Sequence, residues 1–378
     1  MKKVLVLWAY WNVWQVVSID LINSWFFVWI WWRNEKKIDS FISKIKSNNV
    51  EKVLFDISDE KSLLNVFSNY DLIINCLEYT FNQTILDSCI KSAKNYVDLW
   101  DDYEWIKISR SKDWLAKENW IFACIWAWSA PGIVNILTKY AIRDIEEINT
   151  ITISFSDEVK NAPEKMLPFN FQTVVEEIIG DALLFENWKY SFVKWNSKKI
   201  DADFCNTNSL NQCFLPGSLV TNHDEQFSLP DYLSNKWIKN FYFVMKHSDN
   251  VVKLVESLDE FWFLSKEKIN VKWVEISPFD FCNTIMSNFA PQNFKVEDKE
   301  SLFIKIDNIV VEIVNYSVDW IPAWVMNTWI WCSLIAQDIL NNSYTPGVNH
   351  PEDFVDEEWF ISELKKRNFE IYIDWKRI

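Results

Sequence analysis

The sequence predicts an α/β protein in which a Rossmann-type, doubly wound parallel sheet is joined to a second α+β domain with a mixed or antiparallel sheet. Three observations support this. Short apolar runs alternate with helix-like stretches over the first third of the chain. A turn-like motif at residues 8–14 separates the first apolar run from a helical pattern at 15–22. After about residue 145, strands of alternating polarity such as 150–155 take over.

The elements are expected in this order. The first domain should contain six buried strands, at residues 3–8, 26–30, 52–55, 72–76, 96–99 and 121–125. The second should contain strands near 150–155, 182–193, 241–245, 270–276 and 302–315. The tail returns to helices at 332–340 and 356–367 and a strand at 369–373. We therefore expect residues 1–130 and 326–378 to form the first domain, and 131–325 to form the second.

Composition excludes several classes of function. The chain has 38 basic and 53 acidic residues and a net charge of −15, which disfavours nucleic acid and anionic membranes as partners. Its seven cysteines form no CxxC pair, so neither a disulfide framework nor a zinc site is expected. No apolar run reaches the roughly 18 residues of a membrane span. A cytoplasmic protein without a metal is expected.

Glycine is nearly absent, and tryptophan is abundant. The chain has 4 glycines and 24 tryptophans, whereas glycine usually makes up about 7% of residues. Several tryptophans stand where turns and helix ends need glycine, namely Trp120, Trp188, Trp320 and Trp375. Our hypothesis is that UGA codons meaning glycine were read as tryptophan. The alternative is a genuinely Trp-rich chain with an aromatic core or a carbohydrate-binding face.

With glycine restored, residues 8–14 read G-A-Y-G-N-V-G between a strand and a helix. Such a loop makes a tight turn, lets the backbone approach a pyrophosphate and presents the free N–H groups of a helix start. The expected dinucleotide contacts are Trp8, Tyr10, Trp11, Asn12, Val13 and Trp14. As printed, three indoles would fill this space.

The end of the second strand bears on the choice of nicotinamide cofactor. A site for NAD usually has an acid there to bind the ribose 2′-hydroxyl, but this chain has Trp32, Arg33 and Asn34. Arg33 can bind a 2′-phosphate and Asn34 can add a hydrogen bond. NADP(H) is therefore favoured over NAD(H).

These motifs, together with residues 55–59, 73–76, 95–99 and 126–132, resemble the saccharopine dehydrogenase family in the same order. The resemblance implies hydride transfer between a nicotinamide and an imine or secondary amine of an amino acid, in a homodimer joined by the central domain. It also places Asp56 and Ile57 beside the adenine and residues 76–79 at the nicotinamide. The latter are Cys76, Leu77, Glu78 and Tyr79. The substrate cleft would be bordered by Asp98, Ser129, Ala130, Pro131 and Gly132.

The acid/base group stays open between three candidates. His247 has a side chain that titrates near neutrality, Asp98 ends a strand where open sheets bind ligands, and Tyr79 follows the fourth strand. A structural histidine, a loop-capping carboxylate and a packing tyrosine are the alternatives. Glu78 departs from the family's small or aromatic residues, so its role is open.

Several reactions fit the resemblance. They are redox chemistry that forms or cleaves saccharopine, a condensation of the carboxyspermidine type, and lysine 6-deamination with NAD. A non-catalytic module that senses a dinucleotide is the alternative from another class, and it would lack a titratable group near the nicotinamide.

Overall fold

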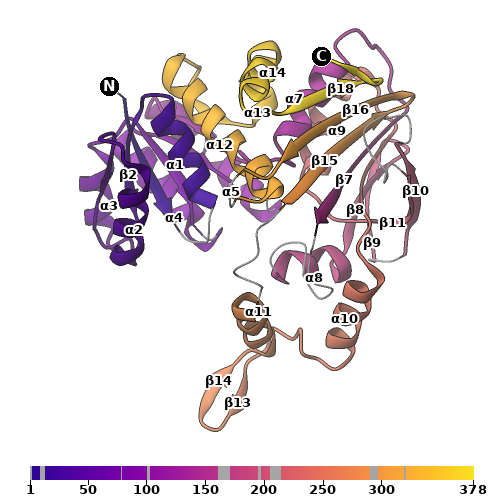
Figure 1. Ribbon diagram of the computed structural model, residues 1–378, viewed down its shortest axis with the longest axis horizontal. Helices are drawn as coiled ribbons and strands as arrows, with labels where there is room; N and C mark the ends of the chain where they lie inside the picture. Colours follow the sequence, from indigo (N-terminus) through magenta and orange to yellow (C-terminus); the bar gives the residue numbers. More distant parts are fainter. Residues whose placement is uncertain are drawn as a thin grey trace. The chain divides into compact units, whose positions relative to one another are not determined.

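The computed structural model describes residues 2–8, 13–77, 79–99, 103–160, 171–194, 197–204, 214–289, 297–318 and 321–378. It divides into two compact units, residues 1–143 with 323–369 and residues 144–322 with 370–378. Figure 1 colours the first unit indigo to violet and, for α12–α14, gold to yellow. The α/β class is confirmed, because one sheet is wholly parallel and the other is mixed.

The first unit is built on a seven-stranded parallel sheet with the strand order β17-β6-β5-β4-β1-β2-β3. Its strands are β1 (Lys3–Trp8), β2 (Phe27–Trp31), β3 (Val50–Lys52), β4 (Leu72–Cys76), β5 (Asn95–Asp98), β6 (Phe122–Cys124) and β17 (Gly347–Asn349). Its helices are α1 (Val13–Asn23), α2 (Glu35–Ile45), α3 (Glu60–Phe67), η1 (Tyr79–Phe81), α4 (Asn82–Ser92), α5 (Tyr103–Ser111), α6 (Asp113–Glu118), α7 (Ile133–Ala141), α12 (Ala323–Asn341), α13 (Pro351–Phe354) and α14 (Glu357–Lys366). Apolar β1 is buried from Val4 onward, as a strand covered on both faces should be.

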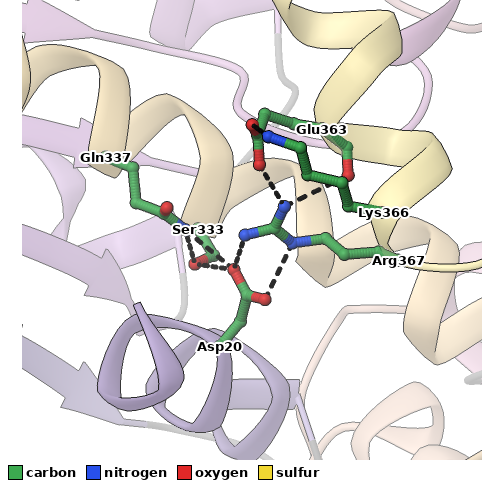
Figure 2. Close-up of polar contacts among 6 residues, drawn as sticks. All are labelled: Asp20, Ser333, Gln337, Glu363, Lys366 and Arg367. Carbon is green, nitrogen blue, oxygen red and sulfur yellow. Dashed lines mark hydrogen bonds and ion pairs between the residues drawn. The ribbon is translucent and has the colours of Figure 1, made fainter. Parts of the chain in front are cut away.

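A polar cluster ties three helices of this unit together (Figure 2). Asp20 on α1 accepts two hydrogen bonds from Arg367, which follows α14, at 2.8 and 2.9 Å. Ser333 and Gln337 on α12 donate to the same carboxylate at 2.7 and 2.8 Å. Arg367 also donates to Glu363 at 2.7 Å. Since α1 packs on α12, these bonds fix the tail helices to the start of the chain.

The second unit has a ten-stranded mixed sheet whose main path is β10-β11-β12-β7-β15-β16-β18-β19, with β8 and β9 off that path. Its strands are β7 (Thr150–Lys160), β8 (Ala182–Glu186), β9 (Lys189–Val193), β10 (Lys199–Asp203), β11 (Phe214–Val220), β12 (Asn240–Met245), β15 (Glu297–Ile306), β16 (Ile309–Tyr316), β18 (Glu370–Ile373) and β19 (Lys376–Arg377). A separate hairpin consists of β13 (Ile269–Val271) and β14 (Val274–Ile276). The helices are α8 (Phe171–Ile179), α9 (Glu225–Tyr232), η2 (Ser234–Lys236), α10 (Asp249–Glu260) and α11 (Pro278–Phe289).

The tail is shared between the units. Helices α12–α14 and strand β17 lie in the first unit, whereas residues 370–378 lie in the second because β18 pairs with β16. The expected boundaries at residues 130 and 326 compare with 143 and 323 in the structure. No helix in the described ranges is long and apolar enough to cross a membrane.

Candidate functional site

The predicted site residues of the first unit gather at one edge of the parallel sheet. Parallel strands all end at the same edge, where open α/β sheets bind their ligands. Trp8 ends β1 and pairs in register with Cys76, which ends β4. Asp98 ends β5 and pairs with Asn75.

At the end of β1, Trp8 is only 1% exposed, and its ring lies 5.3 Å from that of Trp32 and 5.7 Å from that of Phe41. The indole thus fills the place where a dinucleotide turn needs bare backbone. The printed residue does not fit a dinucleotide, whereas glycine would. Tyr10, Trp11 and Asn12 lie outside the described residues. Val13 and Trp14 begin α1, with only their backbone described.

The end of β2 carries cations. Arg33 is exposed, and Trp32 is half-buried. Asn34 caps α2 by accepting a hydrogen bond from the N–H of Lys37. The Lys37 ammonium lies 4.6 Å from the centre of the Trp32 ring. Sequence reasoning missed Lys37, although a lysine in the first turn after this strand was a signal for it.

Two further predicted contacts follow β3, which ends at Lys52 rather than at residue 55. Asp56 is exposed and accepts a hydrogen bond from the N–H of Ser58 at 2.9 Å, which shapes the turn. Ile57 is buried beside it. Both remain the expected adenine contacts.

After β4, Cys76 is buried, and burial together with the charge of Asp98 raises the pKa of its thiol. Leu77 is buried, and its N–H donates to Asn75 at 3.2 Å. Glu78 lies outside the described residues. Tyr79 begins η1, and its side chain is not described.

Asp98 is wholly buried and heavily hydrogen-bonded. One carboxylate oxygen accepts from the Tyr96 hydroxyl at 2.9 Å and from the Trp105 indole at 2.8 Å. The other accepts from the backbone N–H of Trp126 at 3.1 Å. This geometry lets Asp98 position the chain that follows β6.

That chain leads into the predicted substrate loop of Ser129, Ala130, Pro131 and Gly132, which is buried throughout. Gly132 has a φ of +143°, and an added Cβ would lie 1.9 Å from the carbonyl oxygen of Trp128. Its N–H donates to Asn135 in the first turn of α7 at 3.1 Å. Only glycine fits at residue 132.

The predicted catalytic residues do not fall in one unit. His247 follows β12 in the second unit, where its Nε2 lies 3.3 Å from Glu177 on α8. Both side chains are buried, with exposed fractions of 3% and 7%. Sequence reasoning missed Glu177 as its partner. It also missed a second pair, in which Nδ1 of His223 lies 2.5 Å from the buried Glu225.

Parts of the chain are similar to known proteins. Residues 20–129 match the family model of the saccharopine dehydrogenase NADP binding domain. Carboxynorspermidine synthase of Vibrio alginolyticus is 23% identical over 212 residues, which are 53% of this chain and 49% of that protein. The match therefore spans about half of the relative's length.

A solved structure shows the fold of the whole chain. Saccharopine dehydrogenase (L-Glu forming) from Saccharomyces cerevisiae aligns over all of both chains with a TM-score of 0.75 and 11% identity. The chain thus has the saccharopine dehydrogenase fold, and its first unit contains a segment that matches the NADP-binding domain of that family.

Proposed function

We propose that the protein is an NADP(H)-dependent oxidoreductase that acts on a C–N bond of an amino-acid-derived imine or secondary amine. The observation that carries this proposal is the match of residues 20–129 to an NADP-binding domain, a range that contains the ends of β2, β4 and β5 described above. Arg33 and Lys37 would receive the 2′-phosphate. Cys76 and Leu77 would lie toward the nicotinamide, and residues 129–132 would border the substrate. Asp98 would position the chain at residue 126.

Proton transfer is proposed for His247. Its Nε2 lies 3.3 Å from the carboxylate of Glu177 in the same unit. Tyr79 is the alternative on the first unit.

We also propose that tryptophan stands at glycine positions in the printed sequence. Among the described residues, fifteen that are not glycine have positive φ, and eight of these are tryptophan. Large side chains are strongly disfavoured there. The eight include Trp120, Trp188 and Trp375, three of the turn positions expected from sequence.

The test of function uses the chain with glycine at residues 8, 11 and 14 and at the eight described tryptophans with positive φ, called the glycine form below. Reduction of NADP⁺ and NAD⁺ is followed by absorbance with saccharopine, with carboxynorspermidine and with lysine. We expect NADP⁺ reduction with one of the two secondary amines. Binding of NADPH without turnover of any of the three would refute the proposal and favour a sensing module. Turnover of lysine with NAD⁺ would assign the deaminase reaction instead.

A further inference from the structure

His350 lies at the ligand edge of the first sheet, where sequence reasoning did not place it. It directly follows β17, whose carboxyl end lies beside that of β6. Its ring is 4.7 Å from that of Trp126, and the N–H of Trp126 donates to Asp98. Trp126 thus contacts both the ring of His350 and the buried carboxylate of Asp98.

Arg110 on α5 fixes the protonation state of this histidine. Its Nε and Nη2 lie 3.3 and 3.1 Å from Nε2 of His350. A guanidinium can only donate hydrogen bonds, so Nε2 must accept and the ring proton must be on Nδ1. Burial, followed by the charge of Arg110, lowers the pKa of His350 to about 3. The ring is therefore a neutral Nδ1–H donor at neutral pH.

That donor has no acceptor among the described residues, although the side chain is buried. A buried donor without a partner calls for an explanation, and a bound group is one. The fully buried Trp126 beside it has a φ of +69°. Glycine at residue 126 would relieve this backbone and open the space next to the imidazole.

We infer that His350 donates its Nδ1–H to a carboxylate oxygen of the substrate. β17 lies four strands from β1, about 19 Å at the usual strand spacing, which puts His350 on the side remote from the pyrophosphate turn. The adjacent positive charge of Arg110 favours an anionic acceptor. The inference rests on the proposed function and on glycine at residue 126.

The test compares two amide variants of the glycine form. His350→Asn places an amide N–H near the position of Nδ1, whereas His350→Gln places its amide near Nε2, beside Arg110. Saccharopine and carboxynorspermidine are titrated calorimetrically into each protein saturated with NADPH. KM and kcat are measured with NADP⁺, and the melting temperature of each variant is recorded.

We expect His350→Gln to weaken amino-acid binding and raise KM roughly 10- to 100-fold, the usual range for a hydrogen bond to a charged group. The value of kcat should stay within about threefold, since the lost contact binds substrate without taking part in the redox step. His350→Asn should retain most of the affinity at a similar melting temperature. Equal affinities for parent and His350→Gln, in a parent that turns over, would overturn this inference and leave the proposed function intact. A parent that binds NADPH but neither amino acid would overturn both.

Discussion

At the residue scale, backbone angles argue against the printed side chains at several positions. Trp273 joins β13 to β14 with a φ of +75° while its indole is 95% exposed, so no packing compensates for the strained backbone. Among the described residues, seven tryptophans are exposed, and six of them also have a positive φ. The exception is Trp114 in α6, which has no positive φ.

Replacing Trp273 and replacing Trp114 by glycine should have opposite effects on stability. Trp273→Gly should raise the free energy of unfolding by about 1 kcal/mol, because glycine tolerates the left-handed region. Trp114→Gly should lower it by a similar amount, because glycine disfavours a helix. Chemical denaturation of the two single variants of the printed chain measures both. Loss of stability in Trp273→Gly would argue that tryptophan is the native residue there.

Arg33 should decide between the two nicotinamide cofactors. It is exposed at the end of β2, and its guanidinium can bind a 2′-phosphate at two points. In the glycine form, Arg33→Ala should weaken NADPH binding about tenfold or more and leave NADH binding nearly unchanged. Fluorescence titration of both cofactors measures this, with Arg143→Ala, an exposed arginine paired with Glu358, as the control. Equal losses for NADPH and NADH would make Arg33 an ordinary surface charge.

His350 should make stability depend on pH. Its folded pKa of about 3 lies below the usual value of 6.5. The unfolded chain therefore binds a proton that the folded chain excludes, and stability falls as the pH drops from about 6.5 toward 3. The slope is about 1.4 kcal/mol per pH unit. Between pH 7 and pH 5 the parent should lose about 2 kcal/mol relative to His350→Asn. Parallel pH profiles from urea unfolding would contradict a buried neutral imidazole.

At the scale of elements, the cluster in Figure 2 should hold the tail helices in place. Asp20 and Arg367 have side chains only 14% and 13% exposed. Arg367→Met leaves the Asp20 carboxylate with only neutral donors. It should lower the free energy of unfolding by roughly 2–3 kcal/mol, which is less than the cost of breaking a fully buried ion pair. Asp20→Asn combined with Arg367→Met should recover part of this loss.

The control for that experiment is Arg143→Met. It breaks an ion pair of the same 2.8 Å length whose side chains are 52% and 69% exposed, and it should have no measurable effect. Thermal unfolding of the four proteins provides the measurement. Equal destabilisation by Arg367→Met and Arg143→Met would show that the cluster contributes no more than a surface pair.

Periodicity identified most elements of the first unit, because buried parallel strands are continuous apolar runs. It missed β17, whose three residues Gly347–Asn349 form no such run. It placed the strand at 369–373 with the first domain, whereas β18 pairs with β16 of the second unit, since four alternating residues do not specify their partner strand. Candidate site residues could be named from the sequence only where short motifs follow predicted strands. The contact between Arg110 and His350 spans 240 residues, and no local pattern shows it.

At the scale of the whole molecule, the chain passes from one unit to the other at residues 143–144, 322–323 and 369–370. Each unit is therefore assembled from separate segments of sequence. The last crossing gives the second unit the strand β18 at one side of β16. The tail thus contributes helices to one unit and a strand to the other.

This arrangement predicts that the two units respond differently to truncation. Removing residues 370–378 deletes β18, exposes the edge of β16 and loses the wholly buried Ile371. It also removes the mutual hydrogen bonds between Asp374 and Val310. Burial of one isoleucine stabilises by about 1.5–3 kcal/mol, so the melting temperature of the second unit should fall by several degrees. The first unit keeps its sheet and should melt as before.

Scanning calorimetry of the glycine form with NADPH separates these effects, since a ligand that binds the first unit raises only that transition. Removing residues 376–378 alone deletes only the two-residue outer strand β19 and the terminal Ile378. That truncation is the control and should shift the second transition much less. Because an unpaired edge strand invites association, the longer truncation should also increase the apparent mass in light scattering. A fall of both transitions together would mean that β18 stabilises the molecule as one cooperative body, and that the boundary at residue 370 does not separate two units in their unfolding.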